Sequence, residues 1–287
     1  MDDTNVVLAR AALYVVALGL AGIPLYLRIS GTVEAGKGLR LAMAAGAIAA
    51  AAIAAWWAAA SVAAMAALPL GDLDYEMFSA VAGATPIGTV LDVRLAAAIG
   101  VLLAAAFLPR TLILGLIAAA IPIAGVWTGH PGAAEGMTGH VQRLFDAIHL
   151  LAAAVWFGAL IVFLASLIRS GAGRVTLVSR LRAFAATGTV IVATLAVTGT
   201  VNGWLIAQHG FAWSSTWSFL LIVKLGLFAA MLAFAAVNRW KLTPAYEAGA
   251  PGSAGRLGTS LLLEASCAVG IFALVAIIGL SNPAGAV

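Results

Sequence analysis

Histidine, aspartate and methionine side chains gather around residues 130–149, and these residue types can bind a soft metal ion or carry protons. His130 and His140 precede a long apolar run, Met137 lies between them, and His149 lies about two turns inside that run. Neutral imidazole binds copper and zinc, and a thioether such as that of Met137 favours Cu(I). These four residues therefore predict a metal site or a proton-handling site.

The apolar run that carries His149 also places polar groups along one helical face. Gln142, Asp146, His149 and Trp156 are three, four or seven residues apart, so they form one stripe. An aspartate one turn before a histidine can accept its ring N–H and leave the other nitrogen as a ligand. We therefore expect Asp146, Gln142 and Trp156 to support a metal held by His149. The alternative is a solvated pair of loop histidines and a polar helix contact at His149.

The elements that position these residues are apolar runs long enough to cross a membrane. Of 287 residues, 63% are hydrophobic and 9% charged, with a mean hydropathy of +1.09. A membrane helix needs roughly 20 apolar residues, and the alanine-rich runs lack the alternation of barrel strands. The sequence predicts an all-α polytopic bundle in one membrane domain, 1–287. Its eight spans lie near 6–27, 39–68, 86–108, 111–127, 141–168, 181–206, 216–237 and 257–280.

Lysine and arginine distribution predicts the orientation, because short basic loops stay in the cytoplasm. The basic residues follow the first, third, fifth and seventh runs, and the alternate loops hold none except Arg143. We therefore expect both termini outside the cytoplasm. The basic residues are Arg28, Lys37, Arg40, Arg110, Arg169, Arg174, Arg180, Arg182, Arg239, Lys241 and Arg256.

Several polar residues lie inside the predicted spans, where burial is costly and polar groups usually have a function. Thr198 and Asn202 belong to a stripe on the sixth run that either bonds neighbouring helices or lines a path. Arg94 and Lys224 are expected to find opposite charge in Asp92 and Asp146. Glu264 enters from the cytoplasmic end, as a partner for an arginine or as an exit-side carboxylate.

The chain also excludes some functions. Its basic pI of about 9.6 is explained by loops beside anionic lipid, so it predicts no binding of nucleic acid. It has no glycine-rich loop ending in Lys-Ser or Lys-Thr, so we expect no ATP-driven pumping. We predict a binding or transport protein in contact with the lipid bilayer, not an enzyme.

Four segments together resemble a known family. They are TPIGTVLDVR (85–94), Gly129-His130, DAIHLLAAAVWFGAL (146–160) and TWSFLLIVKLGLFAAMLAFAAVNRW (216–240). In order and spacing they are similar to the copper resistance protein D family of bacterial inner-membrane proteins. The resemblance covers the third to eighth runs and includes Glu264. By position, its matched polar residues are Arg94, His130, Asp146, His149, Lys224, Asn238 and Glu264.

The resemblance implies copper handling, with import from the periplasm, often beside a small periplasmic copper-binding partner. Copper as Cu(I) or Cu(II) would bind at an outer-face site built from His130, His140, His149 and Met137. Two alternatives stay open. One is a redox protein that holds haem b and takes electrons from quinol, which needs axial ligands inside the bundle. The other is a scaffold that delivers copper for oxidase assembly without transporting it.

Overall fold

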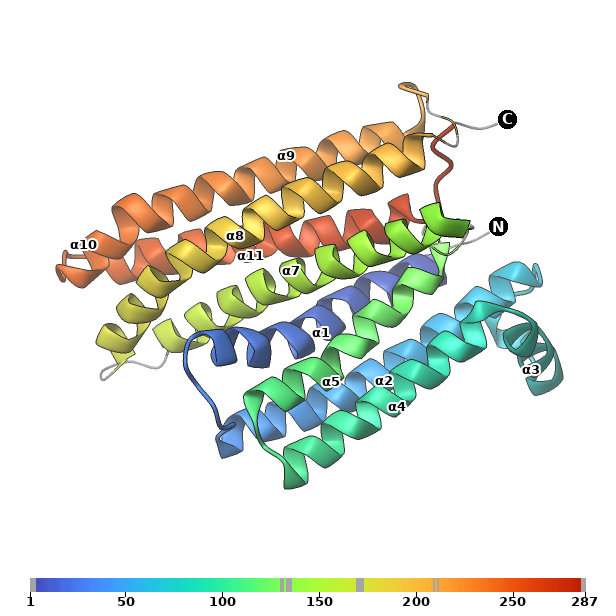
Figure 1. Ribbon diagram of the computed structural model, residues 1–287, viewed down its shortest axis with the longest axis horizontal. Coiled ribbons are helices and arrows are strands. Elements are labelled where there is room, and N and C mark those ends of the chain that lie inside the picture. The colour runs from blue at the N-terminus through green and yellow to red at the C-terminus, as the bar shows by residue number, and fades with distance from the viewer. Residues whose placement is uncertain are drawn as a thin grey trace.

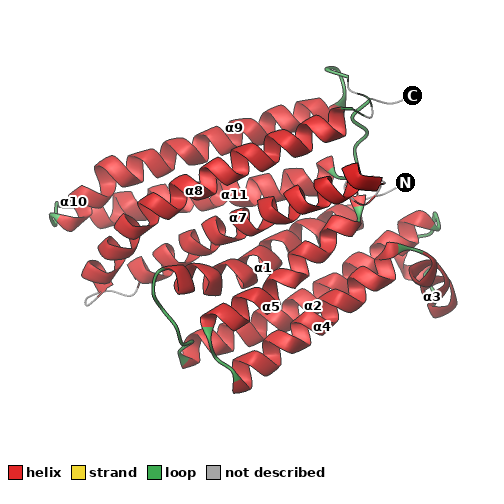
Figure 2. Cartoon of the chain, in the orientation of Figure 1, coloured by secondary structure: helices red, strands yellow, loops and turns green. Residues whose placement is uncertain are grey.

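The fold is helical throughout the part of the chain that we describe. The structure is a computed structural model, and it describes residues 4–129, 132, 136–168, 173–208, 210 and 212–284. Within these residues there is no strand, and the one β contact is an isolated bridge between Glu34 and Arg110. Figure 1 and Figure 2 show long helices running side by side along one direction. The all-α prediction is confirmed.

Seven of the helices are long and apolar enough to cross a membrane, counted over the described residues. Most ends of these helices lie within a few residues of the ends predicted from the apolar runs. The α5–α7 connection contains residues 130, 131 and 133–135, which lie outside the description. The long helices are α1 (Thr4–Ile29), α2 (Lys37–Met65), α4 (Pro86–Phe107), α7 (Gly136–Ile168), α8 (Gly173–Ala207), α9 (Thr216–Val237) and α11 (Ser253–Ile278).

The segment expected as a span at 111–127 is shorter. Helix α5 covers Thr111–Ile123 and continues as a 3₁₀ turn, η2, over Ala124–Trp127. The α-helical part alone rises about 20 Å, and with η2 the segment rises about 28 Å, slightly less than the roughly 30 Å of a hydrocarbon core. Pro122 lacks a backbone N–H, which favours a change of helix type at this point. The eighth crossing therefore stays a prediction.

The loops fall at two ends of the bundle. The N- and C-terminal ends lie at one end together with α3 (Tyr75–Ala84), and we call this the terminal end (Figure 1). The α1–α2, α4–α5 and α10–α11 connections lie at the opposite end, which we call the basic end because Arg28, Lys37 and Arg110 lie there. The segregation of basic loops to one end agrees with the pattern read from the sequence.

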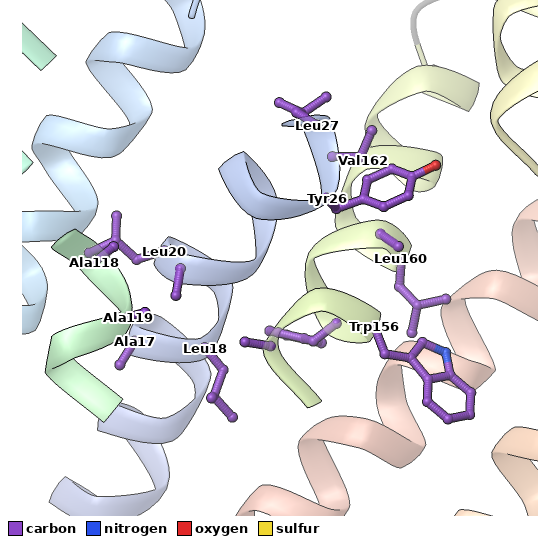
Figure 3. Close-up of a cluster of buried hydrophobic side chains, with 14 of the residues drawn as sticks. Ala17, Leu18, Leu20, Tyr26, Leu27, Ala118, Ala119, Trp156, Leu160 and Val162 are labelled. Atoms are coloured by element: carbon purple, nitrogen blue, oxygen red, sulfur yellow. The ribbon is translucent and has the colours of Figure 1, made fainter. Parts of the chain in front are cut away.

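Helix α1 lies at the centre and packs against α2, α5, α7 and α11. Its closest approach is to α7, where Gly22 faces Gly158. A Cβ atom on either glycine would overlap the backbone of the other helix, so only glycine permits this contact. Leu18 and Leu20 of α1 belong to the buried cluster that α5 and α7 complete (Figure 3). Close packing of small residues therefore holds the core.

The last four long helices form a unit of their own beside α1. Helix α8 packs on α7, α9 packs on α11, and α11 packs on both α7 and α1. Helix α9 passes into a π-helical turn, η3 (Asn238–Leu242), and then into the short helix α10 (Thr243–Glu247). Single π turns inside helices are frequent at functional sites. The unit of α7, α8, α9 and α11 contains most of the polar residues singled out above.

Candidate functional site

Three cavities follow one another through the unit of α7, α8, α9 and α11. The terminal cavity, of about 160 Å³, opens near the terminal end and is also lined by α1, α2 and α4. The middle cavity, of about 550 Å³, is mostly apolar. The basic-end cavity, of about 250 Å³, reaches Arg239 and Trp240. The first two share His149 and Lys224 in their walls, and the last two share Trp156.

His149 lies at the junction of the terminal and middle cavities with its tautomer fixed by α8. Its Nδ1 is 2.8 Å from Oγ1 of Thr198, and that hydroxyl lies 2.6 Å from the Thr194 carbonyl. A hydroxyl has one proton, which it donates to the carbonyl, so its oxygen accepts from Nδ1–H. The Nε2 atom therefore keeps its lone pair and has no hydrogen bond to any described residue.

Asp146 does not hold His149, although the sequence places it one turn earlier on the same helix. Its Oδ1 accepts from Nδ2 of Asn202 at 3.4 Å, and its charge interacts with the ammonium of Lys224. Two polar residues of α8 thus contact two of α7, His149 with Thr198 and Asp146 with Asn202. The stripe on α8 links helices, and it also borders the terminal cavity at Asn202.

Positive charge dominates the terminal cavity. Arg10, Arg94 and Lys224 line it, and Asp146 is the one carboxylate among its described lining residues. Arg94 is only 6% exposed, its Nε donates to the Ile121 carbonyl at 3.3 Å, and its guanidinium stacks 4.3 Å from the Trp57 ring centre. Asp92 is exposed and does not pair with it, contrary to the expected pairing.

A second polar cluster separates the middle cavity from the basic-end cavity. Glu264 is buried, and its two carboxylate oxygens accept from Nε1 of Trp156 at 2.8 Å and from Nδ2 of Asn238 at 2.9 Å. Figure 3 shows Trp156 extending from α7 on the side away from α1. Its ring also meets Phe228 edge-on. The expected arginine partner of Glu264 is replaced by these two neutral donors.

The three-histidine site expected at one face is not assembled among the described residues, which hold no metal-binding group of three or more His, Cys, Asp or Glu. His140 is exposed, and its Nδ1 accepts from Arg143 at 3.4 Å. Met137 is 77% exposed. Nine residues of helix put His140 about 13 Å along the axis from His149, too far to share one ion. His130 and His209 lie outside the described residues.

Gln142 is buried on α7, but it does not line the three cavities. Two residues that sequence reasoning did not place at the site do line them. Arg10 of α1 reaches the terminal cavity, and Met231 of α9 lines the middle cavity. Arg10 carried a signal, since an arginine seven residues into α1 is unusual in a membrane span. Met231 carried none, because methionine is common in apolar packing.

Comparison with known proteins identifies related families and proteins. The model of the family "Copper resistance protein D" matches residues 178–278, and that of "Copper resistance protein D-like, N-terminal domain" matches residues 1–140. The chain is 34% identical over 217 residues to copper resistance protein D of Pseudomonas syringae pv. tomato, covering 69% of both chains. It is 33% identical over 139 residues to inner membrane protein YebZ of Escherichia coli strain K12, covering 48% of this chain and 47% of that relative. No solved structure matches the chain.

The fold and the cavities define a multi-helix membrane protein whose polar residues converge on cavities between its helices. The chain belongs to the copper resistance protein D family, as the resemblance read from its motifs predicted. Both family matches and the relative from Pseudomonas connect it with copper resistance.

Proposed function

We propose that this protein lies in the bacterial inner membrane and imports copper from the periplasm into the cytoplasm. The positive-inside rule supports this orientation, because it assigns the basic end to the cytoplasm and the terminal end, with both termini, to the periplasm. The name of the Escherichia coli relative, an inner membrane protein, supports the location.

The observation that carries the proposal is the series of three cavities with a free imidazole nitrogen at the first junction. His149 lines both the terminal cavity and the middle cavity. The thioether of Met231 lines the middle cavity, and thioether and imidazole are ligands that Cu(I) accepts. A copper ion therefore has successive soft ligands across the apolar part of the bundle.

Met137 and His140 act before His149 in this proposal, as a separate collecting site. They are three residues apart at the terminal end of α7, so both side chains lie on one helical face. Both are exposed, which suits transfer from a small periplasmic copper-binding protein. His130, just before α7, is the natural third ligand of the collecting site.

Passage beyond the middle cavity requires the contact between Trp156 and Glu264 to open. The indole forms the wall that the middle and basic-end cavities share, and its hydrogen bond to the buried carboxylate holds it there. Opening would expose Glu264 as an oxygen ligand on the cytoplasmic side. Because the chain has no phosphate-binding loop, the copper gradient or a partner protein drives the movement.

Copper uptake into proteoliposomes tests the proposal. His149→Ala is expected to abolish saturable uptake of Cu(I), whereas His140→Ala should raise the concentration for half-maximal uptake and leave the maximal rate. His140→Ala is a matched comparison for His149→Ala, because each variant removes one histidine side chain from α7. Wild-type uptake by the His149 variant would contradict the path. Binding to wild-type protein with no accumulation would favour the delivery scaffold instead.

The size of the middle cavity favours haem-based redox function as a second candidate. Its volume of about 550 Å³, its apolar lining and the free Nε2 of His149 suit a haem with one axial imidazole. A Soret band in the protein as purified, lost in His149→Ala, would support this candidate. A colourless preparation from haem-supplemented cells would remove it.

A further inference from the structure

The terminal cavity has more positive charge than its one carboxylate balances. Arg10 comes from α1, Arg94 from α4 and Lys224 from α9, and only Asp146 of α7 opposes them among the described lining residues. With neutral His149, the described lining residues carry three positive charges and one negative charge, a net excess of two positive charges. A bare copper cation meets repulsion there, so the cavity as it stands is unsuited to hold the metal ion alone.

Arg94 is fixed by its surroundings and does not extend into solvent, whereas Arg10 is half-buried. Arg94 is 94% buried by its 6% exposure, and its Nη1 is a buried donor without a hydrogen-bond partner among the described residues. A buried N–H of a charged group that lacks an acceptor is costly, so this donor is available to a ligand or an ordered water in the cavity.

Two glycines make room for the arginines. A Cβ atom on Gly279 of the α11 end would overlap the guanidinium of Arg10. A Cβ atom on Gly125 would lie 3.2 Å from Nη2 of Arg94, tighter than ordinary packing. Side chains at these positions would displace the cations from the cavity wall. The backbone of η2 and of the α11 end thus accommodates both guanidinium groups.

We propose that the terminal cavity binds a small carboxylate anion, held by Arg10, Arg94 and Lys224. Guanidinium groups form paired hydrogen bonds with carboxylates, and a lysine adds a third charge on the facing helix. The volume of about 160 Å³ fits a molecule with two or three carboxylates. If the protein imports copper as proposed above, copper reaches His149 as a complex with this anion, since His149 lines the same cavity.

Calorimetric titration of citrate into the purified, metal-free full-length protein in detergent, at constant ionic strength, tests the site. Saturable binding is expected, weakened roughly tenfold or more by Arg94→Gln and by Lys224→Gln, because each removes a charged hydrogen bond. Arg94→Lys keeps the charge but loses the paired hydrogen bonds, so its affinity should lie between those of the wild type and Arg94→Gln. Asp146→Asn should tighten binding, since it removes the opposing carboxylate, and a merely damaged protein would not bind more tightly.

Arg28→Gln and Lys37→Gln are the matched controls, because both side chains are exposed at the basic end. Citrate affinity equal to wild type is expected for both. Absence of saturable binding, equal affinity in Arg94→Gln, or weaker binding in Asp146→Asn would overturn the site. Citrate binding without copper uptake would support the anion site and contradict the import proposal. Copper uptake without citrate binding would support import and contradict the anion site.

Discussion

Nδ1 of His149 on α7 lies 2.8 Å from the hydroxyl oxygen of Thr198 on α8, and this contact fixes which ring nitrogen is free. The hydroxyl proton goes to the Thr194 carbonyl, so the ring must donate. Residues that are 49 apart in sequence thus determine the chemistry of the imidazole. The contact also ties α7 to α8 at the junction of two cavities.

Removal of the Thr198 hydroxyl should weaken metal binding without removing the ligand. Thr198→Val keeps the shape of the side chain but frees the His149 ring to change tautomer and rotate. We expect Cu(I) affinity to fall about 10- to 100-fold, as is usual when the partner of a ligating histidine is lost. Competition with a chromophoric Cu(I) chelator measures this. Thr198→Ser keeps the hydroxyl and should bind like wild type; equal loss in both would refute the tautomer argument.

Glu264 should stabilise the fold through its two donors and not through its charge. Glu264→Ala leaves the indole N–H of Trp156 and the amide of Asn238 without acceptors, at about 1–3 kcal/mol each. Oδ1 of Asn238 is buried and has no hydrogen-bond partner among the described residues. If the Asn238 side-chain amide rotates by half a turn, a glutamine at 264 can accept from Nε1 of Trp156 and donate to Oδ1 of Asn238. Thermal unfolding in detergent should therefore rank wild type and Glu264→Gln together above Glu264→Ala.

The exposed carboxylate Glu34 provides the control for this series. Glu34→Gln should unfold at the wild-type temperature. Should Glu264→Gln prove as unstable as Glu264→Ala, the carboxylate charge would be the stabilising feature, and the neutral hydrogen-bond account would be wrong.

The close approach of α1 and α7 should tolerate no side chain. Gly158→Ala forces a Cβ atom into the backbone of Gly22, so the two helices must separate and lose packing along their length. We expect a loss of folded protein after detergent extraction, measured by size-exclusion chromatography. Gly38→Ala in α2 has open space around it and should match or exceed wild-type stability. Normal folding of Gly158→Ala would contradict this packing.

The proposed orientation makes a labelling prediction. In a Cys267→Ala background, Ser281→Cys at the terminal end should react with a membrane-impermeant maleimide in intact spheroplasts. Gly38→Cys at the basic end should react only after the membrane is permeabilised. Both positions are outside the cores of the long helices or at their ends. The reverse pattern would place the basic end in the periplasm and reverse the direction of import.

The positions of most helices could be predicted from the long apolar runs. The contacts between helices could not, because a run describes one helix at a time. The seventh run was predicted at 216–237 and α9 occupies the same residues, because the polar Ser215 caps it and the run is uninterrupted. The run at 111–127 forms α5 and the turn η2, with Pro122 near the change of helix type, and its crossing of the membrane stays a prediction.

In the candidate site, too, positions along one helix could be predicted and contacts between helices could not. Helical periodicity placed Asp146 one turn from His149 and so suggested that pair, but periodicity compares residues of one helix only. The partner of His149 is Thr198, on the next helix, and the partner of Asp146 is Asn202. The expected meeting of His140 with His149 was wrong for a related reason, since the continuous α7 separates them by its own rise.

The central place of α1 has a consequence for biogenesis. This helix leaves the ribosome before α7 and α11, yet its glycine contact and much of its buried face belong to those later helices. Until they arrive, the membrane or an insertion factor must shelter a surface shaped for another helix. The surface of α1 is therefore fully covered only when α11, in the last third of the chain, has been synthesised, and truncation before α11 leaves that part of the first helix without its partner.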